Sequence, residues 1–217
     1  MKKENFRWLW AVVAAFLAFG VWTYLLGIID VQAIGPRGSA VGFAAINKPF
    51  HNLTGVNMVL YSITDWLGLV PVAFGFGFAA LGLCQWIKRR NILNVDFSIL
   101  MLGAFYIAVL AAYLFFESNV VNYRPVLIEG FLEASYPSST TMLALCIMPT
   151  SAMQLSGRIK KGPFHRAITL LIYAFTAFMV VGRLISGVHW LSDIVGGVLL
   201  SSGLVMLYRF AVGIKKI

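Results

Sequence analysis

The clearest pattern along the chain is a series of long apolar runs separated by short polar segments. A helix needs about 20 residues to cross a bilayer, and the runs approach or exceed this length. The predicted spans cover residues 8–29, 59–87, 97–116, 140–155, 168–185 and 190–212. A membrane β-barrel is disfavoured because its strands would alternate apolar and polar residues. The pattern predicts an all-α polytopic membrane protein with six transmembrane helices, forming a single integral-membrane domain over residues 1–217.

The amino-acid composition agrees with this fold class. Hydrophobic residues make up 60% of the 217-residue chain and charged residues 12%, whereas a soluble domain carries about twice as much charge. The basic start of the chain resembles a signal peptide, but the apolar run that follows extends to Ile29, which is longer than a typical signal sequence. We expect a retained first helix, with VQA at residues 31–33 as a weak cleavage-like alternative.

The distribution of lysine and arginine predicts the orientation. One set of helix ends carries Lys2, Lys3, Arg7, Lys88, Arg89, Arg90, Arg158, Lys160, Lys161, Arg166, Arg209, Lys215 and Lys216, and the other carries Arg37, Lys48, Arg124 and Arg183. Because cytoplasmic segments are enriched in basic residues, both termini are predicted in the cytoplasm. Segments 30–57, 117–139 and 186–189 then face outward. Segment 40–55 is mildly amphipathic and is expected along the membrane surface.

The net charge of +9 does not indicate nucleic-acid binding. The basic residues lie at the ends of apolar runs and form no binding face, as membrane topology requires. Cys84 and Cys146 lie inside apolar runs, where they are expected as small buried hydrophobic residues. The sequence therefore predicts membrane lipids as surroundings, with no nucleic-acid partner, disulfide framework or metal site. It does not indicate an oligomeric state.

Four unusual polar pieces fall on the predicted outer side. They are NYRP at residues 122–125, YPSSTT at 136–141, GR at 182–183 and GVHWLSD at 187–193. Histidine and charged residues near the hydrocarbon are costly and usually functional where they cluster. We therefore interpret these pieces as parts of one site.

The residue types in these pieces suit phosphate chemistry. A helix start exposes unpaired N–H groups, so Ser138 and Ser139 are predicted to offer amides and hydroxyls to a phosphate, one side chain also capping the helix. Arg124 and Arg183 are expected to clamp the same phosphate. His189 and Asp193 are four residues apart, hence on one face of a helix. The carboxylate would fix the imidazole tautomer and leave the other nitrogen free to attack.

These pieces resemble the three-part signature of the type-2 phosphatidic acid phosphatase superfamily, which includes relatives of the vanadium haloperoxidases. The family pattern is K-x6-R-P, then P-S-G-H, then S-R-x5-H-x3-D. GRLISGVHWLSD at residues 182–193 matches the spacing of the third block, RP at 124–125 matches the first, and PSST at 137–140 matches the second in two positions. ITDWLG at 63–68 resembles a stretch common in bacterial members.

The resemblance implies a lipid phosphatase of the bacterial plasma membrane, with no cofactor and an active site facing outward. His189 would attack phosphorus to form a phospho-histidine, and Asp193 would orient its ring. The phosphate oxygens would be held by Arg124, Arg183, Ser138, Ser139 and Thr140. No carboxylate cluster suited to Mg²⁺ is present, so activity is expected to survive EDTA.

The sequence departs from the family pattern at three positions. Glu117 stands at the first-block lysine, Ser139-Thr140 replaces the second-block Gly-His, and Gly182 replaces the third-block serine. In the family, the missing histidine is the general acid, a role worth about 10²–10⁴-fold in rate. A threonine does not donate a proton at neutral pH.

Three explanations of the missing histidine stay open. The first is a substrate with a good leaving group, such as undecaprenyl diphosphate, because departing phosphate needs less protonation than an alcohol. The second is another proton donor, for which His51 is the spare outer histidine. The third is a catalytically impaired protein that binds or carries lipid phosphates. The lipid itself, a prenyl diphosphate, phosphatidate or phosphatidylglycerol phosphate, is left open. A channel or transporter is disfavoured because no broken-helix pair is evident.

Overall fold

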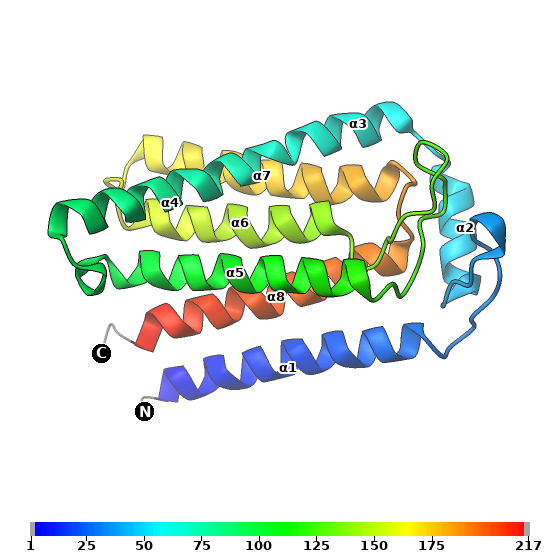
Figure 1. Ribbon diagram of the computed structural model, residues 1–217, viewed down its shortest axis with the longest axis horizontal. Coiled ribbons are helices and arrows are strands. Elements are labelled where there is room, and N and C mark those ends of the chain that lie inside the picture. Colours follow the sequence, from blue (N-terminus) through cyan, green and yellow to red (C-terminus); the bar gives the residue numbers. More distant parts are fainter. Residues whose placement is uncertain (1–2, 215–217) are drawn as a thin grey trace.

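The computed structural model describes residues 3–214, which form helices and no strands. The elements are α1 (Lys3–Leu26), η1 (Pro36–Gly38), α2 (Ala44–Thr54), α3 (Met58–Leu67), α4 (Leu69–Arg89), η2 (Ile92–Asn94), α5 (Phe97–Ser118), α6 (Ser139–Ser156), α7 (Pro163–Ile185) and α8 (Leu191–Ile214). The predicted all-α class is confirmed (Figure 1). The terminal lysines Lys2, Lys215 and Lys216, used in the orientation prediction, lie outside the described residues.

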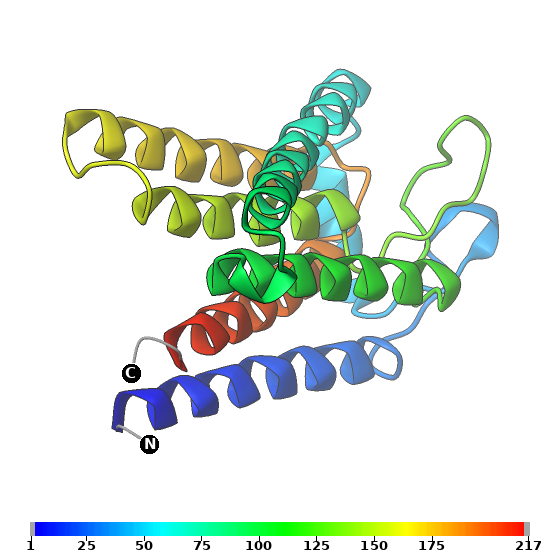
Figure 2. The same ribbon diagram turned by 60° about the vertical axis from the view of Figure 1, so that its left-hand side comes forward.

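The helix bundle is built around α6. This helix packs against α4, α5, α7 and α8, and α8 packs in turn against α1 (Figures 1 and 2). More than half of the α6 residues are buried by these neighbours. The second and third blocks of the predicted site therefore lie at the start of the central helix and beside it.

Within residues 3–214, five apolar segments are long enough to cross a membrane. They are Phe6–Leu26, Met58–Arg89, Phe97–Ser118, Pro163–Ile185 and Leu191–Gly213. Helix α6, which corresponds to the predicted span 140–155, is not among them, so the six-span count stays a prediction. Its sequence opens with three hydroxyl residues and includes Gln154. A helix enclosed by other helices does not need an apolar surface, because it is shielded from lipid.

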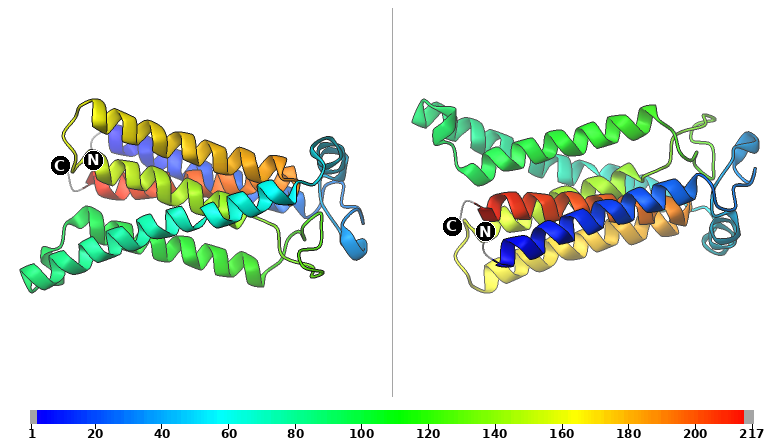
Figure 3. Two further views of the ribbon diagram at one scale, coloured as in Figure 1. Left: turned by 90° about the horizontal axis from the view of Figure 1, so that it is seen from above. Right: turned by 90° about the horizontal axis from the view of Figure 1, so that it is seen from below.

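The span predicted over residues 59–87 corresponds to the apolar segment Met58–Arg89. The structure divides this apolar segment at Gly68 into α3 and α4. Pro71 has no N–H and cannot donate to the carbonyl of Leu67, which weakens a continuous helix at this point. Figure 3 shows that α3 and α4 cross the bundle obliquely and that α4 and α5 diverge from the other helices toward the end that carries the termini.

The two ends of the bundle carry different elements. Both chain termini lie at one end, together with the α4–α5 and α6–α7 links (Figure 1). The opposite end, called the site end below, carries α2 and the segments 27–43, 119–138 and 186–190. Those basic residues of the two groups that lie within residues 3–214 separate between these ends as predicted. Which end faces the cytoplasm stays a prediction.

Helix α2 lies across the site end, roughly perpendicular to the bundle (Figure 1). It is attached to α8 through Asn47, which is buried. The Asn47 side chain donates from Nδ2 to Ser192 Oγ at 2.9 Å and accepts from the Ser192 N–H at 3.1 Å. This transverse helix therefore holds the N-terminus of α8, where the predicted His-Asp pair begins.

Candidate active site

Two loops and several helix ends meet at the site end. Segment 186–190 links α7 to α8, and segment 119–138 links α5 to α6. Isolated bridges between Tyr123 and Ala134 and between Ile128 and Phe131 fold the second loop back on itself. It projects beyond the helices in Figure 2. The structure thus brings the four polar pieces to one end of the bundle, as topology predicted.

His189 is held by one ring nitrogen only. It lies in segment 186–190, two residues before α8, and is 3% exposed. Its Nδ1 is 2.9 Å from Ser135 Oγ. Its Nε2 is buried and has no hydrogen-bond partner among residues 3–214. The Nε2 atom is therefore the position at which this ring can meet a ligand.

Asp193 is fully buried in the first turn of α8. Its Oδ2 accepts from Ser135 Oγ at 2.6 Å and from the Trp190 N–H at 3.0 Å. Its Oδ1 accepts from Asn122 Nδ2 at 3.0 Å. The expected direct contact with His189 is replaced by a bridge through Ser135. The helical-face argument fails because His189 precedes the helix that carries Asp193.

The turn that carries His189 is fixed by the link between α2 and α3. Gly187 has a φ of 68°, and a Cβ atom there would lie 1.8 Å from the carbonyl oxygen of Gly55. The Asn57 N–H donates to the Ser186 carbonyl at 2.9 Å. Only glycine fits at position 187, because both its φ and the close backbone approach exclude a side chain.

Arg183 is fully buried near the end of α7 and faces α3. Its Nη1 lies 3.5 Å from Asp65 Oδ1 and 3.4 Å from Thr64 Oγ1. Its Cζ is 4.7 Å from the ring centroid of Tyr61. Its Nε has no hydrogen-bond partner in the described part of the chain. The stretch ITDWLG, noted in the sequence, therefore supplies the groups that hold this guanidinium.

The neighbouring helix α3 explains why glycine stands at position 182, where the family has a serine. A Cβ atom on Gly182 would lie 2.7 Å from Thr64 Cγ2. Thr64 is fully buried, and its hydroxyl lies against Arg183. Helix α3 thus fills the space that a third-block serine side chain would require, and it brings its own hydroxyl to the arginine.

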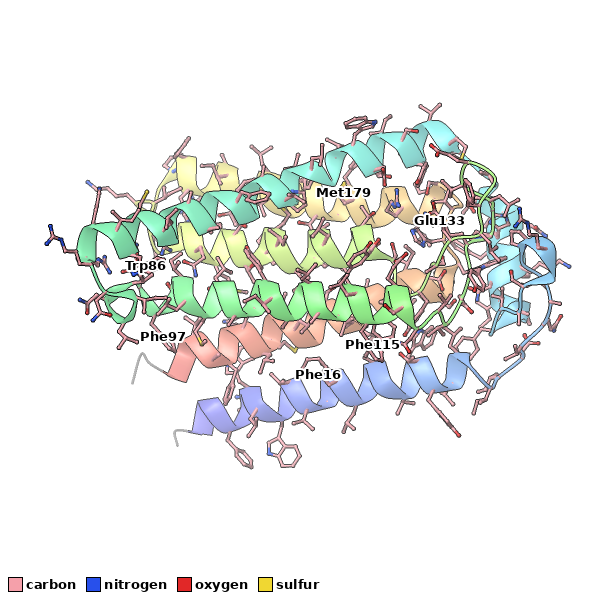
Figure 4. The ribbon with its side chains drawn as sticks, in the orientation of Figure 1. Phe16, Trp86, Phe97, Phe115, Glu133 and Met179 are labelled. Atoms are coloured by element: carbon pink, nitrogen blue, oxygen red, sulfur yellow. The ribbon has the colours of Figure 1, made fainter. Side chains whose placement is uncertain are left out.

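Arg124 lies at the base of the 119–138 loop and is 8% exposed. Its N–H donates to the Glu133 carbonyl at 3.0 Å, and its Nε lies 3.1 Å from Glu133 Oε2. Figure 4 shows Glu133 at the site end. The Arg124 Nη1 is buried and has no hydrogen-bond partner within residues 3–214. Its Cζ is 5.8 Å from the Tyr61 ring, so Tyr61 lies beside both arginines.

The start of α6 differs in detail from the prediction. Ser138 is the N-cap residue, but its side chain makes no capping hydrogen bond, so the predicted cap is wrong at this position. Its hydroxyl is buried and has no partner in the described range. Its N–H instead donates to the Asp193 carbonyl at 3.2 Å. The unpaired amides of the first turn begin with Ser139.

A polar cavity of about 290 Å³ opens at this point. Its lining includes His189, Arg124, Ser135, Ser139, Glu117 and Glu133. Arg183, Asp193 and Ser138 do not line it. The free Nε2 of the histidine, an arginine with an unused nitrogen and the helix start therefore share one space. The two glutamates give this cavity an acidic side as well.

An apolar groove of about 340 Å³ adjoins the cavity. The two share Tyr113, Ser139 and Met142 in their linings. The groove runs between the end of α3, α5 and α6 and is lined by side chains such as Leu110, Leu143 and Ile147. Thr140 lines this groove and not the polar cavity. A molecule with a polar head and an apolar chain therefore fits across the two spaces.

Burial holds the pKa of His189 well below its ordinary value, and the positive charges of Arg124 and Arg183 lower it further. Both effects disfavour a second proton on the ring. The imidazole is therefore neutral at neutral pH, which is the form that a nucleophile or general base requires.

The cavity lining separates two other residues noted in the sequence, His51 and Glu117. His51, the spare histidine, does not line the cavity; its ring centroid is 5.4 Å from that of Trp190. Glu117, at the family lysine position, does line it. Within residues 3–214, no group of three or more His, Cys, Asp or Glu side chains is placed to hold a metal ion.

Sequence reasoning missed three residues of the site. Ser135 was visible only as the residue before YPSSTT, Asn122 as the start of NYRP, and Tyr61 as part of an apolar run. Each belongs to the site through a contact with a residue far away in the sequence, either Asp193 or an arginine. No local spacing signals such contacts.

The comparisons with known proteins concern the family and the fold. A model of the PAP2 superfamily matches residues 107–213, a region that contains Arg124, Ser135, Arg183, His189 and Asp193. A search of curated proteins finds no match.

Among solved structures, the fold is similar to that of a transmembrane PAP2-type phosphatidylglycerolphosphate phosphatase from Bacillus subtilis. The TM-score is 0.53 and the sequence identity is 17%, over 95% of this chain and 96% of that chain. At this identity the likeness concerns the fold.

Proposed function

The chain belongs to the PAP2 superfamily, and on this basis we propose that it is a membrane lipid phosphatase whose nucleophile is His189 and whose substrate is a lipid diphosphate such as undecaprenyl diphosphate. The observation that carries the proposal is the buried, unpartnered Nε2 of His189 in a cavity that Arg124 also lines. A structural histidine would have its second nitrogen satisfied.

The reaction has two displacement steps at phosphorus. His189 Nε2 bonds to the terminal phosphorus as the bond from phosphorus to the leaving oxygen breaks, and the leaving group keeps the electron pair. A water then attacks the phospho-histidine, releases inorganic phosphate, loses a proton to solvent and restores the imidazole. The ring proton stays on Nδ1 throughout.

Charge stabilisation comes from the two arginines and the start of α6. Arg124 and Ser139 both line the cavity, which supports a role for the Arg124 guanidinium and the Ser139 amide in holding phosphoryl oxygens. Arg183 adds a second positive charge from α7. The buried hydroxyl of Ser138, at the N-cap of α6, has no hydrogen-bond partner in the described chain and is free to donate to a phosphoryl oxygen. Such electrostatic positioning supplies most of the catalysis in phosphoryl transfer.

The adjoining groove supports a lipid substrate. Its apolar lining lies among membrane-spanning helices, and it meets the cavity at Tyr113, Ser139 and Met142. The lipid chain would occupy the groove and the head group the cavity. With the basic residues gathered at the opposite end, the site faces outward from the plasma membrane.

The absence of a general acid at Thr140 supports the choice of a diphosphate. A departing phosphate is a weaker base than an alkoxide and needs less protonation. Thr140 also lines the groove and not the cavity, so its hydroxyl is not placed among the groups that surround the phosphate.

One observation favours a second function, a lipid-phosphate binder without turnover. Glu133 forms an ion pair with Arg124 Nε. This nitrogen is therefore not free to bind a phosphate. A binder of this kind would take up diphosphate lipid and release no phosphate at any pH.

The test is phosphate release by purified protein from lipid monophosphates and diphosphates, with and without EDTA. We expect release from diphosphates in both conditions, its loss in His189→Ala, and an acid-labile, base-stable phospho-enzyme in the wild type. His51→Ala, which changes a histidine outside the cavity, serves as the matched control and should retain activity. Unchanged turnover in His189→Ala would exclude the nucleophile, and binding without turnover would favour the second function.

A further inference from the structure

We propose that Ser135 is a positioning residue of this reaction: its hydroxyl joins His189 to Asp193 and selects the imidazole tautomer that can attack phosphorus. The inference rests on the proposed function for its catalytic consequence. The hydrogen-bond arrangement itself is a property of the substrate-free protein and is tested separately.

The three residues form a buried chain. Ser135 Oγ lies 2.9 Å from His189 Nδ1 and 2.6 Å from Asp193 Oδ2. The exposed fractions are 2% for Ser135, 3% for His189 and 0% for Asp193. No ion pair or hydrogen bond joins the histidine directly to the aspartate, so the serine is the link between them.

The direction of the hydrogen bonds follows from the partners of Asp193. The carboxylate also receives the Trp190 N–H at 3.0 Å and Asn122 Nδ2 at 3.0 Å. These groups only donate in this geometry, so the carboxylate acts as an acceptor throughout, as its ionised form must. The hydroxyl of Ser135 has one hydrogen, which goes to Asp193. Toward His189 it can only accept.

The tautomer of His189 is therefore determined. Nδ1 must carry the proton to donate to Ser135, and Nε2 keeps its lone pair. This is the nitrogen that faces no partner in the described chain. As Nε2 bonds to phosphorus, the ring becomes cationic, and its Nδ1–H donates more strongly into a hydroxyl already polarised by a carboxylate.

The position of Ser135 is fixed by its surroundings. Its N–H donates to the Asn122 carbonyl at 2.9 Å. The next residue, Tyr136, is fully buried, and its hydroxyl lies 2.6 Å from Thr23 Oγ1 of α1. The Tyr136 ring packs on α8 at Gly196, where an added Cβ would lie 2.3 Å from it. Ser135 is thus held against α8 and α1 although it belongs to a loop.

The first measurement is the tautomer itself. The chain has three histidines, His51, His165 and His189, so replacing the first two with glutamine leaves one ring to observe by ¹⁵N NMR. We expect a protonated Nδ1 and a bare Nε2 in this background. Ser135→Ala removes the hydroxyl and keeps the Ser135 backbone, which also hydrogen-bonds the ring. The Nε2–H form should therefore gain population without replacing the Nδ1–H form completely. An unchanged tautomer in Ser135→Ala overturns the proposal, whatever the turnover.

The second measurement is turnover. Ser135→Ala should lower kcat by about 100-fold with little change in KM, because the serine holds the nucleophile and not the lipid. Ser135→Thr, which restores the hydroxyl, should recover most of the rate. Ser135→Cys, with a weaker donor and acceptor of similar size, should be intermediate, and it replaces the alanine variant in both measurements if that variant does not fold.

The control is Ser62→Ala, an exposed serine of α3 whose hydroxyl donates to the Met58 carbonyl. It should change neither the tautomer nor kcat. A kcat of Ser135→Ala within about twofold of wild type would contradict the positioning role. If the wild type itself releases no phosphate, the proposed function fails, and the NMR result still decides the tautomer.

Discussion

Tyr61 packs its ring against the guanidinium of Arg183, whose Cζ lies 4.7 Å from the ring centroid, although the two residues come from different helices. Arg124 approaches the same ring at 5.8 Å. One aromatic face of α3 therefore organises two like charges from α7 and from the 119–138 loop. A ring quadrupole attracts each cation and lessens the cost of holding them close together.

Replacement of this ring should weaken phosphate binding. Tyr61→Leu is expected to raise KM for the lipid substrate about tenfold, because each arginine loses a cation–π contact. Tyr61→Phe keeps the aromatic face and should stay close to wild type. Inhibition by vanadate offers a second measure of the same anion site. Equal KM values for the leucine and phenylalanine variants would show that the ring does not organise the arginines.

The pH dependence of kcat/KM should reflect the lowered pKa of His189. Protonation blocks Nε2, so the rate falls as pH drops through this pKa. Because burial and the two arginines lower the pKa, the acid limb should lie below the ordinary histidine value of about 6.5. Arg124→Gln removes one of the positive charges, so the pKa should rise and the limb should shift to higher pH.

The limb is read from pH profiles of kcat/KM, which report the free enzyme. Glu133→Gln is the informative companion variant, since it removes the carboxylate beside Arg124 and leaves the cation. Its acid limb should not move upward. A limb in the wild type above the ordinary histidine value would contradict a neutral, buried nucleophile.

The contact between Gly182 and Thr64 predicts a compensating pair of substitutions. Gly182→Ala places a Cβ 2.7 Å from Thr64 Cγ2, and overpacking of this kind costs about 1–3 kcal/mol. Thr64→Ser removes that methyl and keeps the hydroxyl beside Arg183. The double variant should therefore be more stable than Gly182→Ala alone.

Thermal unfolding in one detergent measures all three variants. Residues in contact show non-additive effects, so the coupling between Gly182→Ala and Thr64→Ser should be favourable. Additive changes in stability would mean that α3 and α7 move apart to accept the new side chain.

A histidine at position 140 should widen the substrate range. Thr140→His restores the residue type that donates the proton to an alkoxide leaving group, a contribution of about 10²–10⁴-fold in favourable geometry. We expect turnover of lipid monophosphates to rise relative to diphosphates. Thr140→Val removes only the hydroxyl and should leave diphosphate turnover unchanged. A large loss of diphosphate turnover in the valine variant would assign the threonine hydroxyl a role in the present reaction.

The sequence predicts those helices whose position depends only on the hydropathy of their own residues. Long apolar runs locate α1, α5, α7 and α8, because a lipid-facing helix must be apolar along its length. The break at Gly68 is missed because hydropathy averaged over the run hides Asp65, Gly68 and Pro71 among apolar neighbours. The enclosed helix α6 is the least certain span for the opposite reason, since its neighbours permit hydroxyl residues and Gln154.

The sequence predicts which segments meet at the candidate site, but it does not predict which side chains contact one another there. Topology alone brings Arg124, Arg183 and His189 to one end of the bundle. The bridge through Ser135 was not predictable, because it joins residues 54 positions apart. The spacing of His189 and Asp193 even suggests the wrong contact, since a helical face applies only after the helix has begun.

The backbone contact between Gly187 and Gly55 has a consequence for the membrane itself. The backbone of the turn that carries His189 lies directly against the backbone of the link after α2, and the Asn57–Ser186 hydrogen bond also joins the two segments. We therefore expect a displacement of α2 to move the turn that carries His189. Thickness and surface charge of the bilayer should then alter the rate constant for chemistry in addition to substrate access, and vesicles of different lipids should give different kcat values for the same protein.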